Sequence, residues 1–227
     1  TPGSTVLDVA AGNGNATLAL ARRWCEVVST DYVEALLAKG RQRAEAEALP
    51  ATFKVADAEE LPFANASFDA AVSIFGTMFA PNQVKAAGEL LRVCKPGGKI
   101  GLASWTPEGF IGQVFKTLGK HIAPAPGLNS PSQWGAKSWL ESTFGPHARS
   151  LQIRERHFNF RYKSAEHFLE VFRTYYGPMH KAFLALDAIQ QEQLADDIRA
   201  LIDTFDMARD GSVKLPSAYA EVVIVKA

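Results

Sequence analysis

Two hydrophobic periods alternate along the first 105 residues. Short apolar runs, typical of buried strands, are separated by longer segments in which apolar residues recur every three or four positions, as in helices that cover a sheet. This pattern predicts strands at 5–9, 26–30, 52–56, 68–74 and 99–105, with helices at 14–24, 32–47 and 82–94. Strands and helices that alternate at this spacing favour a parallel, doubly wound sheet, which binds ligands at the carboxyl ends of its strands.

The pattern changes after Trp105. Residues 106–148 are rich in proline, glycine and tryptophan, and predict a capping region with short helices. A long strand-like run at 151–162 follows, then helices at 164–174, 179–186 and 189–208 and a final strand at 217–225. The fold class predicted is α/β: a doubly wound, mostly parallel, seven-stranded sheet with helices on both faces, an antiparallel last strand and a cap in the C-terminal half.

A loop of small residues joins the first strand to the first helix. Its sequence is Asp8-Val9-Ala10-Ala11-Gly12-Asn13-Gly14. A strand that turns into a helix through glycines brings backbone N–H groups and a helix N-terminus to one point, where a ligand can lie against the main chain. Taken alone, this loop is also consistent with an ordinary strand-to-helix turn.

Acidic residues end the next two predicted strands. Asp31 follows the second strand and Asp57 follows the third, so both carboxylates are expected at the ligand-binding edge. Each also has a purely structural interpretation, Asp31 as the N-cap of the next helix and Asp57 as the cap of a turn.

Composition narrows the functional classes. Lys plus Arg and Asp plus Glu number 24 each, so no net field favours nucleic acid or an anionic membrane. No apolar run is long enough to span a membrane. Cys25 and Cys94 are expected to be buried free thiols, which favours a cytoplasmic location. The histidines show no metal-ligand spacing, and the basic residues at 149–163 are expected on the exposed face of an outer strand.

The chain resembles the class I S-adenosylmethionine-dependent methyltransferases, in particular the small-molecule group that includes quinone-biosynthesis enzymes. Four signals in the family's order carry the resemblance: the loop from Leu7 to Gly14, Asp31, the segment Asp57-Ala58-Glu59-Glu60-Leu61-Pro62-Phe63, and Leu90-Leu91-Arg92-Val93-Cys94-Lys95-Pro96-Gly97-Gly98. The resemblance implies a single domain over 1–227, with a cofactor-binding half at 1–105 and a substrate cap and final strands at 106–227.

The resemblance implies a role for each acid. Asp31 would accept from the ribose hydroxyls, Asp57 from the adenine amino group, and Asp8 would organise the glycine loop near the methionine ammonium. The end of the fourth strand would lie beside the sulfonium. The cofactor-binding residues expected are Asp8, Ala10, Ala11, Gly12, Gly14, Asp31, Tyr32, Asp57, Ala58, Glu59, Phe75 and Met78.

Two features depart from the family pattern. Ala10 stands where the family usually has the first glycine of its loop. The family also usually has a helix before the first strand that closes over the cofactor, and no such helix precedes Thr5 in this sequence, which leaves the lid undefined.

The acceptor is expected to be a small aromatic or lipophilic molecule. Methyl transfer from a sulfonium is an in-line displacement in which alignment and desolvation do most of the catalysis, so no catalytic residue is assigned. The substrate-binding candidates are Phe79, Trp105, Trp134 and Tyr175, and the candidate bases are His121, His167, Tyr175 and His180. No nucleic acid partner is expected, since the fourth strand lacks an Asn-Pro-Pro-Tyr type of sequence, and the chain would act as a monomer or homodimer.

Two other functions share part of this pattern. A nicotinamide-dependent oxidoreductase would have the glycine loop and Asp31, but not the segment from Asp57 to Phe63, and it would need a hydride-transfer acid such as a Tyr-x-x-x-Lys pair. A protein that binds S-adenosylmethionine or S-adenosylhomocysteine without turnover would keep every signal.

Overall fold

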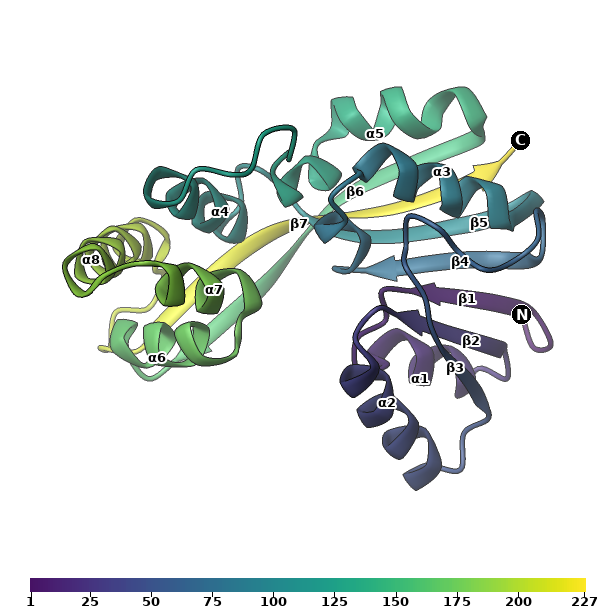
Figure 1. The fold of residues 1–227 in the computed structure, drawn as a ribbon, viewed down its shortest axis with the longest axis horizontal. Helices are drawn as coiled ribbons and strands as arrows, with labels where there is room; N and C mark the ends of the chain where they lie inside the picture. Colours follow the sequence, from purple (N-terminus) through teal and green to yellow (C-terminus); the bar gives the residue numbers. More distant parts are fainter. The chain divides into compact units, whose positions relative to one another are not determined.

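The computed structural model describes all 227 residues and contains one seven-stranded sheet in the order β3-β2-β1-β4-β5-β7-β6 (Figure 1). The strands are β1 Thr5–Val9, β2 Glu26–Asp31, β3 Ala51–Val55, β4 Phe68–Ile74, β5 Cys94–Trp105, β6 Ala148–Tyr162 and β7 Val213–Lys226. Strands β1 to β5 pair in parallel, whereas β7 runs in the opposite direction (Figure 1). The predicted mostly parallel sheet with an antiparallel last strand is confirmed.

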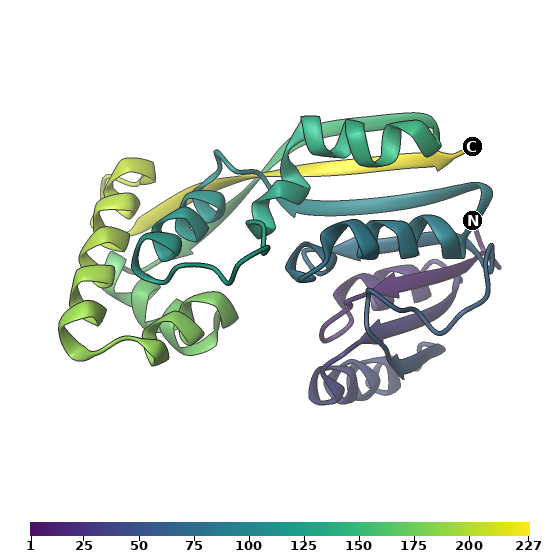
Figure 2. The ribbon, with the colours of Figure 1, turned by 45° about the horizontal axis from the view of Figure 1, so that its top comes forward.

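Helices pack around this sheet (Figures 1 and 2). They are α1 Asn15–Ala21, α2 Glu34–Ala46, α3 Gln83–Val93, α4 Phe110–His121, α5 Lys137–Phe144, α6 Ala165–Tyr175, α7 Gly177–Ala185 and α8 Ala188–Phe205. Short 3₁₀ turns occupy Thr77–Phe79, Pro131–Gly135 and Gly145–His147. Helix α1 ends earlier than predicted because Trp24 takes a left-handed backbone conformation, with φ of 59°, and turns the chain into β2.

The chain forms two compact units that both use β6 and β7. Unit 1 contains residues 1–104, 134–154 and 220–227, and unit 2 contains 105–133 and 155–219. We expected the cap to begin at residue 106, but α5 and the first part of β6 belong to unit 1. Helix α5 packs on α3 of unit 1. An aromatic cluster ties the preceding turn to α5, with Trp134 4.8 Å from Trp139 and 6.1 Å from Phe144 between ring centroids.

Each unit has its own hydrophobic core. In unit 1 the core is centred on the middle of the sheet, where Leu7, Ala71 and Ile100 are fully buried. The thiols Cys25 and Cys94 are free and buried there, as predicted. Unit 2 has an aromatic core, in which Phe168 stacks on Phe172 with centroids 3.9 Å apart. Further edge contacts join Phe110, Tyr162 and Phe205 to Phe168 or to one another.

None of the helices has the length and apolar character required to cross a membrane. Strand β6 forms one edge of the sheet, and its basic residues Arg149, Arg154, Arg156 and Arg161 are exposed, as predicted for an outer strand.

A close backbone contact positions the loop after β1. Ala10 has φ of 53°, in the left-handed region, and it lies against Gly76 at the end of β4. A Cβ atom added to Gly76 would lie 2.7 Å from the Ala10 methyl group and would also overlap the Ala10 carbonyl oxygen. Glycine at position 76 therefore provides the room that alanine at position 10 occupies.

This contact predicts that Gly76→Ala lowers the free energy of unfolding by about 1–3 kcal/mol through overpacking. Because Ala10→Gly removes one of the two overlaps, Gly76→Ala should cost less in an Ala10→Gly background. Urea denaturation of the four proteins measures this coupling, and additive effects would contradict the contact.

Gly88→Ala is the matched control for this series. A Cβ on Gly88 meets nothing within 4 Å, and the residue lies inside α3. Since alanine is the better helix former, this change should leave the free energy of unfolding unchanged or raise it by up to about 1 kcal/mol.

Candidate functional site

The glycine loop lies at the carboxyl edge of the sheet, between β1 and α1. Gly12 and Gly14 have φ of 57° and 83°, in the left-handed region that glycine adopts without strain. The Ala11 N–H donates to the Thr30 carbonyl at 2.9 Å, which ties the loop to β2. No side chain caps the start of α1, so backbone N–H groups of its first turn are free to meet a ligand.

Asp31 joins this loop to the end of β2. Its Oδ2 accepts from the Gly12 N–H at 2.8 Å and its Oδ1 from the Val33 N–H at 2.9 Å, and the residue is 5% exposed. The N-cap of α2 is Val33, so the predicted N-cap role of Asp31 is wrong, and its carboxylate instead bonds the backbone two residues on. Each oxygen keeps capacity for a further donor.

Asp57 follows β3 and shapes the turn that begins the next loop. Its Oδ1 accepts from the Glu59 N–H at 2.8 Å, and its carbonyl oxygen accepts from the Glu60 N–H at 3.1 Å. The turn-capping interpretation of Asp57 is therefore observed. Because Asp57 is exposed, its carboxylate remains accessible to a ligand as well.

Asp8 is the buried acid of the site. It is 1% exposed, and its Oδ2 accepts from the Thr17 hydroxyl at 2.6 Å, whereas its Oδ1 has no hydrogen-bond partner. Burial raises the pKa of Asp8 to about 6, against the opposing effect of the Thr17 hydrogen bond. A buried acceptor without a donor is costly, so this oxygen is suited to a ligand that brings a cation or an N–H group.

The end of β4 is held against the end of β1. The Ser73 hydroxyl donates to the Val9 carbonyl at 2.8 Å and accepts from the Thr77 N–H at 2.9 Å. Phe75 follows with φ of 54° and is half-buried. Met78 is only 1% exposed and Phe79 is 40% exposed, so Phe79 has more surface than Met78 to offer a ligand.

The structure brings many of the sequence-predicted residues together. Hydrogen bonds connect Asp31 to the loop that contains Ala10, Ala11, Gly12 and Gly14, while Asp8 contacts α1 through Thr17. Tyr32 is 73% exposed and adjoins Asp31, and Ala58 and Glu59 belong to the loop after β3. The cofactor roles of all these residues remain predictions.

The predicted substrate-binding residues are more scattered. Trp134 is fully buried in the aromatic cluster of unit 1, which gives it no surface for a substrate. Trp105 and Tyr175 belong to unit 2, where Trp105 is 8% and Tyr175 is 82% exposed.

The candidate bases of unit 2 are engaged locally. The Nε2 atom of His121 lies 3.0 Å from the Asp197 carboxylate, His167 Nδ1 accepts from the Lys163 N–H at 3.3 Å, and His180 Nδ1 lies 2.9 Å from the Arg173 carbonyl oxygen. These contacts assign no proton-transfer role to any of them.

Sequence reasoning missed Thr17 and Ser73. Both are buried polar residues whose hydroxyls bond the site's own backbone or carboxylate. Thr17 lies three positions after Gly14, in the first turn of α1, and that spacing could have identified it. Nothing in the sequence around Ser73 marks it.

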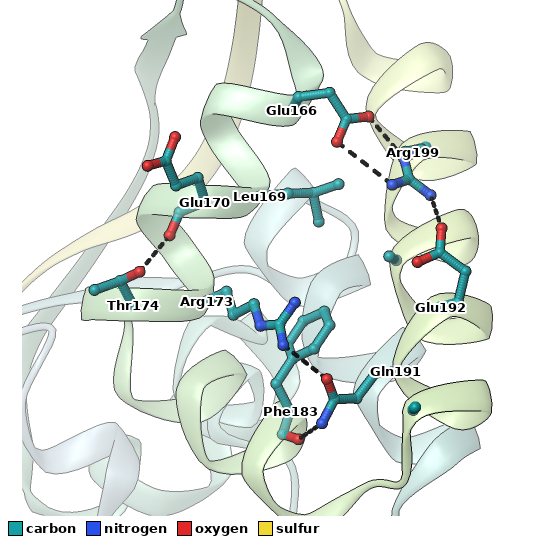
Figure 3. A pocket seen from close by; sticks show the side chains of 11 residues that line it. Glu166, Leu169, Glu170, Arg173, Thr174, Phe183, Gln191, Glu192 and Arg199 are labelled. Atoms are coloured by element: carbon teal, nitrogen blue, oxygen red, sulfur yellow. Dashed lines mark hydrogen bonds and ion pairs between the residues drawn. The ribbon is translucent and has the colours of Figure 1, made fainter.

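Several hollows lie outside this site. A groove of about 360 Å³ in unit 2 is lined by α6, α7 and α8 (Figure 3). There Arg199 pairs with Glu166, while Arg173 lies over the Phe183 ring and donates to Gln191 at 2.7 Å. These side chains bind one another, which is typical of a structural network.

Two further hollows, of about 940 and 710 Å³, adjoin Trp24 and Cys25 in unit 1. The larger hollow includes the residues that begin β1, β2 and β3, Thr5, Glu26 and Ala51. The smaller one includes Ser4, just before β1, and Asp69, near the start of β4. Both hollows therefore lie at the amino edge of the sheet, and none of the predicted cofactor residues lines them.

Comparisons with known proteins agree with this geometry. The family model of the methyltransferase domain matches residues 6–98. A demethylmenaquinone methyltransferase of Deinococcus radiodurans is 34% identical over 167 residues, which cover 70% of this chain and 69% of that protein. An uncharacterized protein of Mycobacterium tuberculosis is 38% identical over 185 residues, which cover 80% of this chain and 67% of that protein.

A solved structure is similar over the whole chain. The crystal structure of a putative methyltransferase from Bacillus halodurans has a TM-score of 0.67 and 19% identity, and the match covers 100% of this chain and 94% of that one. At this identity the likeness concerns the fold. With the sequence relatives, the matched domain and the loop at the carboxyl edge, it shows that the chain belongs to the class I S-adenosylmethionine-dependent methyltransferases of the small-molecule type.

Proposed function

We propose that the carboxyl edge of unit 1 holds S-adenosylmethionine through three carboxylates and the glycine loop. Asp31 would accept from the ribose hydroxyls, and Asp57 with the adjoining Ala58 and Glu59 would hold adenine. Asp8 would face the ammonium of the methionine part. The unpartnered Oδ1 of Asp8 carries this proposal, because a buried carboxylate oxygen without a donor is the environment that favours a bound cation.

The reaction proposed is methyl transfer to a small aromatic or lipophilic acceptor. When bound, the cofactor supplies an electrophilic methyl group on a sulfonium. The residues of this chain would orient the two reactants in line and exclude water, with Phe75 at the end of β4 beside the reacting centre. Positioning is the whole catalytic contribution proposed, and no base is assigned.

Two observations support the acceptor class. Unit 2 is rich in aromatic side chains, among which Phe158 is 51% exposed and lies 4.8 Å from Phe160 between ring centroids. Among the relatives, the name of the Deinococcus radiodurans protein states methylation of demethylmenaquinone, an aromatic and lipophilic acceptor. We further propose that the protein works in the cytoplasm as a monomer or homodimer.

Turnover tests the reaction directly. The protein is incubated with S-adenosylmethionine and a panel of phenols, quinols and lipophilic acids, and the release of S-adenosylhomocysteine is measured. Release that depends on one acceptor class supports the proposal. Tight cofactor binding with no release for any acceptor would instead indicate a protein that binds the cofactor without turnover.

Asp31→Ala should weaken the binding of S-adenosylhomocysteine by about 1–3 kcal/mol, because the ribose hydroxyls and the Gly12 N–H both lose their acceptor. Isothermal titration calorimetry measures the change. Asp69→Ala is the matched control, since Asp69 is also a hydrogen-bonded carboxylate but accepts from the Thr5 N–H at the start of the strands. Equal affinity in Asp31→Ala and wild type would refute the assignment.

The pKa of Asp8 predicts a pH-dependent affinity. The ligand ammonium binds the ionised carboxylate, and this form is lost as the pH falls through about 6. Wild-type affinity for S-adenosylhomocysteine should therefore fall below that pH, by up to about tenfold per pH unit. Asp8→Asn should bind more weakly at pH 7.5 and lack this dependence. The same pH profile in both proteins would show that another group titrates.

A further inference from the structure

The loop after Asp57 is held by charged side chains of α3. Arg92 donates through Nη2 to the Leu61 carbonyl at 2.8 Å, and through Nη1 to the Phe63 carbonyl at 2.6 Å and to the Asn65 side chain at 3.1 Å. A planar guanidinium can bind several acceptors at fixed angles. Arg92 therefore fixes the path of the chain from Leu61 to Asn65.

Glu89 completes this clamp. Its Oε2 accepts from the Leu61 N–H at 2.6 Å, and Arg92 Nε donates to its Oε1, also at 2.6 Å. Both backbone polar groups of Leu61 are thus bound by side chains of α3, while the Leu61 side chain is 4% exposed. The side chains of Glu89 and Arg92 are themselves only 15% and 29% exposed, so water competes little for these bonds.

The charges of the clamp are stable near neutral pH. The hydrogen bond from Arg92, helped by the Leu61 N–H, lowers the pKa of Glu89, and Glu89 raises the pKa of Arg92. Hydrogen bonds that involve ionised groups are shorter and stronger than neutral ones. The clamp is consequently a stiff support for the loop.

The other end of α3 holds the beginning of the same loop. The carboxylate of Glu59 accepts from the Asn82 N–H at 2.6 Å, and Asn82 caps α3 by accepting from the Lys85 N–H at 3.0 Å. The loop is therefore bound at both ends of one helix. Its conformation depends on α3 as much as on its own residues.

We infer that Glu89 and Arg92 are positioning residues that set the affinity for the adenine part of the cofactor. This inference rests on the proposed function, which places adenine beside Asp57, Ala58 and Glu59. Only Glu60 separates these residues from Leu61. If the clamp is released, the Leu61 N–H loses its acceptor and the Leu61 carbonyl keeps only the Phe63 N–H, so the residues that face adenine lose the support that fixes their position.

A pair of ligands separates this role from simple stabilisation of the fold. S-adenosylhomocysteine carries the adenine amino group, and S-inosylhomocysteine carries an oxygen in its place. Wild type should prefer the former, because Asp57 accepts from the amino group. Arg92→Gln and Glu89→Gln should reduce the affinity for S-adenosylhomocysteine, roughly tenfold for Arg92→Gln, and change that for S-inosylhomocysteine much less. The preference should therefore shrink.

The control is Arg22→Gln. Arg22 makes a comparable two-pronged pair with Glu47, at 2.8 Å from Nε, but on the exposed end of α1. Arg22→Gln should leave the ratio of the affinities for S-adenosylhomocysteine and S-inosylhomocysteine at the wild-type value. Thermal unfolding shows which variants are folded. If Arg92→Gln is not folded, Glu89→Gln replaces it in the comparison, because glutamine keeps an oxygen that can accept from the Leu61 N–H.

The outcomes separate the inference from the proposed function. Asp57→Asn retains the turn cap but adds an NH₂ group opposite the adenine amino group, so it should abolish the preference. If Asp57→Asn abolishes it while the folded clamp variants keep it, the clamp has no positioning role. If Asp57→Asn and wild type show the same preference, the placement of adenine is wrong.

Discussion

The hydrogen bond from the Gly12 N–H to the Asp31 carboxylate is the interaction on which the site depends. It holds the loop after β1 against the end of β2, at 2.8 Å, and with the bond from Val33 it fixes the orientation of the carboxylate. The consequence is a pre-formed edge, in which backbone donors at the start of α1 and an acceptor on β2 are placed before any ligand binds. Such pre-organisation reduces the ordering cost of binding.

Around this bond, the site is assembled from supports that lie on different strands. Ser73 attaches the end of β4 to the end of β1, and Gly76 leaves room for Ala10 in the loop. The alanine that departs from the usual family pattern is thus accommodated by a glycine elsewhere in the chain. At Asp8, in contrast, the buried Oδ1 atom has no hydrogen-bond donor. Unsatisfied buried groups are rare in folded proteins and often mark functional sites.

The sequence predicted the sheet well because its signals are local. Short apolar runs mark the parallel strands, as at Val6, Leu7 and Val9 in β1, and these runs predicted the order and type of the elements in the first 105 residues. The boundary between the two units was not predictable in this way. It depends on the packing of α5 on α3, two helices far apart in the sequence, and a tryptophan in a proline-rich segment looks the same whether it is in the core or in a cap.

For the site, the acidic residues could be predicted from the sequence, whereas the hydrogen bonds that hold the site together could not. The positions of Asp8, Asp31 and Asp57 at or just beyond the carboxyl ends of β1, β2 and β3 identified all three acids from sequence. The support from Glu89 and Arg92 could not be inferred, because their contacts with Leu61 join two motifs separated by 28 and 31 residues. Hydrogen bonds of this kind have no periodicity in the sequence.

Calorimetric titration of the protein with S-adenosylhomocysteine, beside NAD and NADP, tests the central claim most directly. We predict micromolar binding of S-adenosylhomocysteine alone, since Asp31 at the end of β2 and Asp57 after β3 fit a ribose and an adenine, while the sequence has no Tyr-x-x-x-Lys pair for hydride transfer. Binding of a nicotinamide nucleotide, or no binding of S-adenosylhomocysteine by the folded protein, would contradict it.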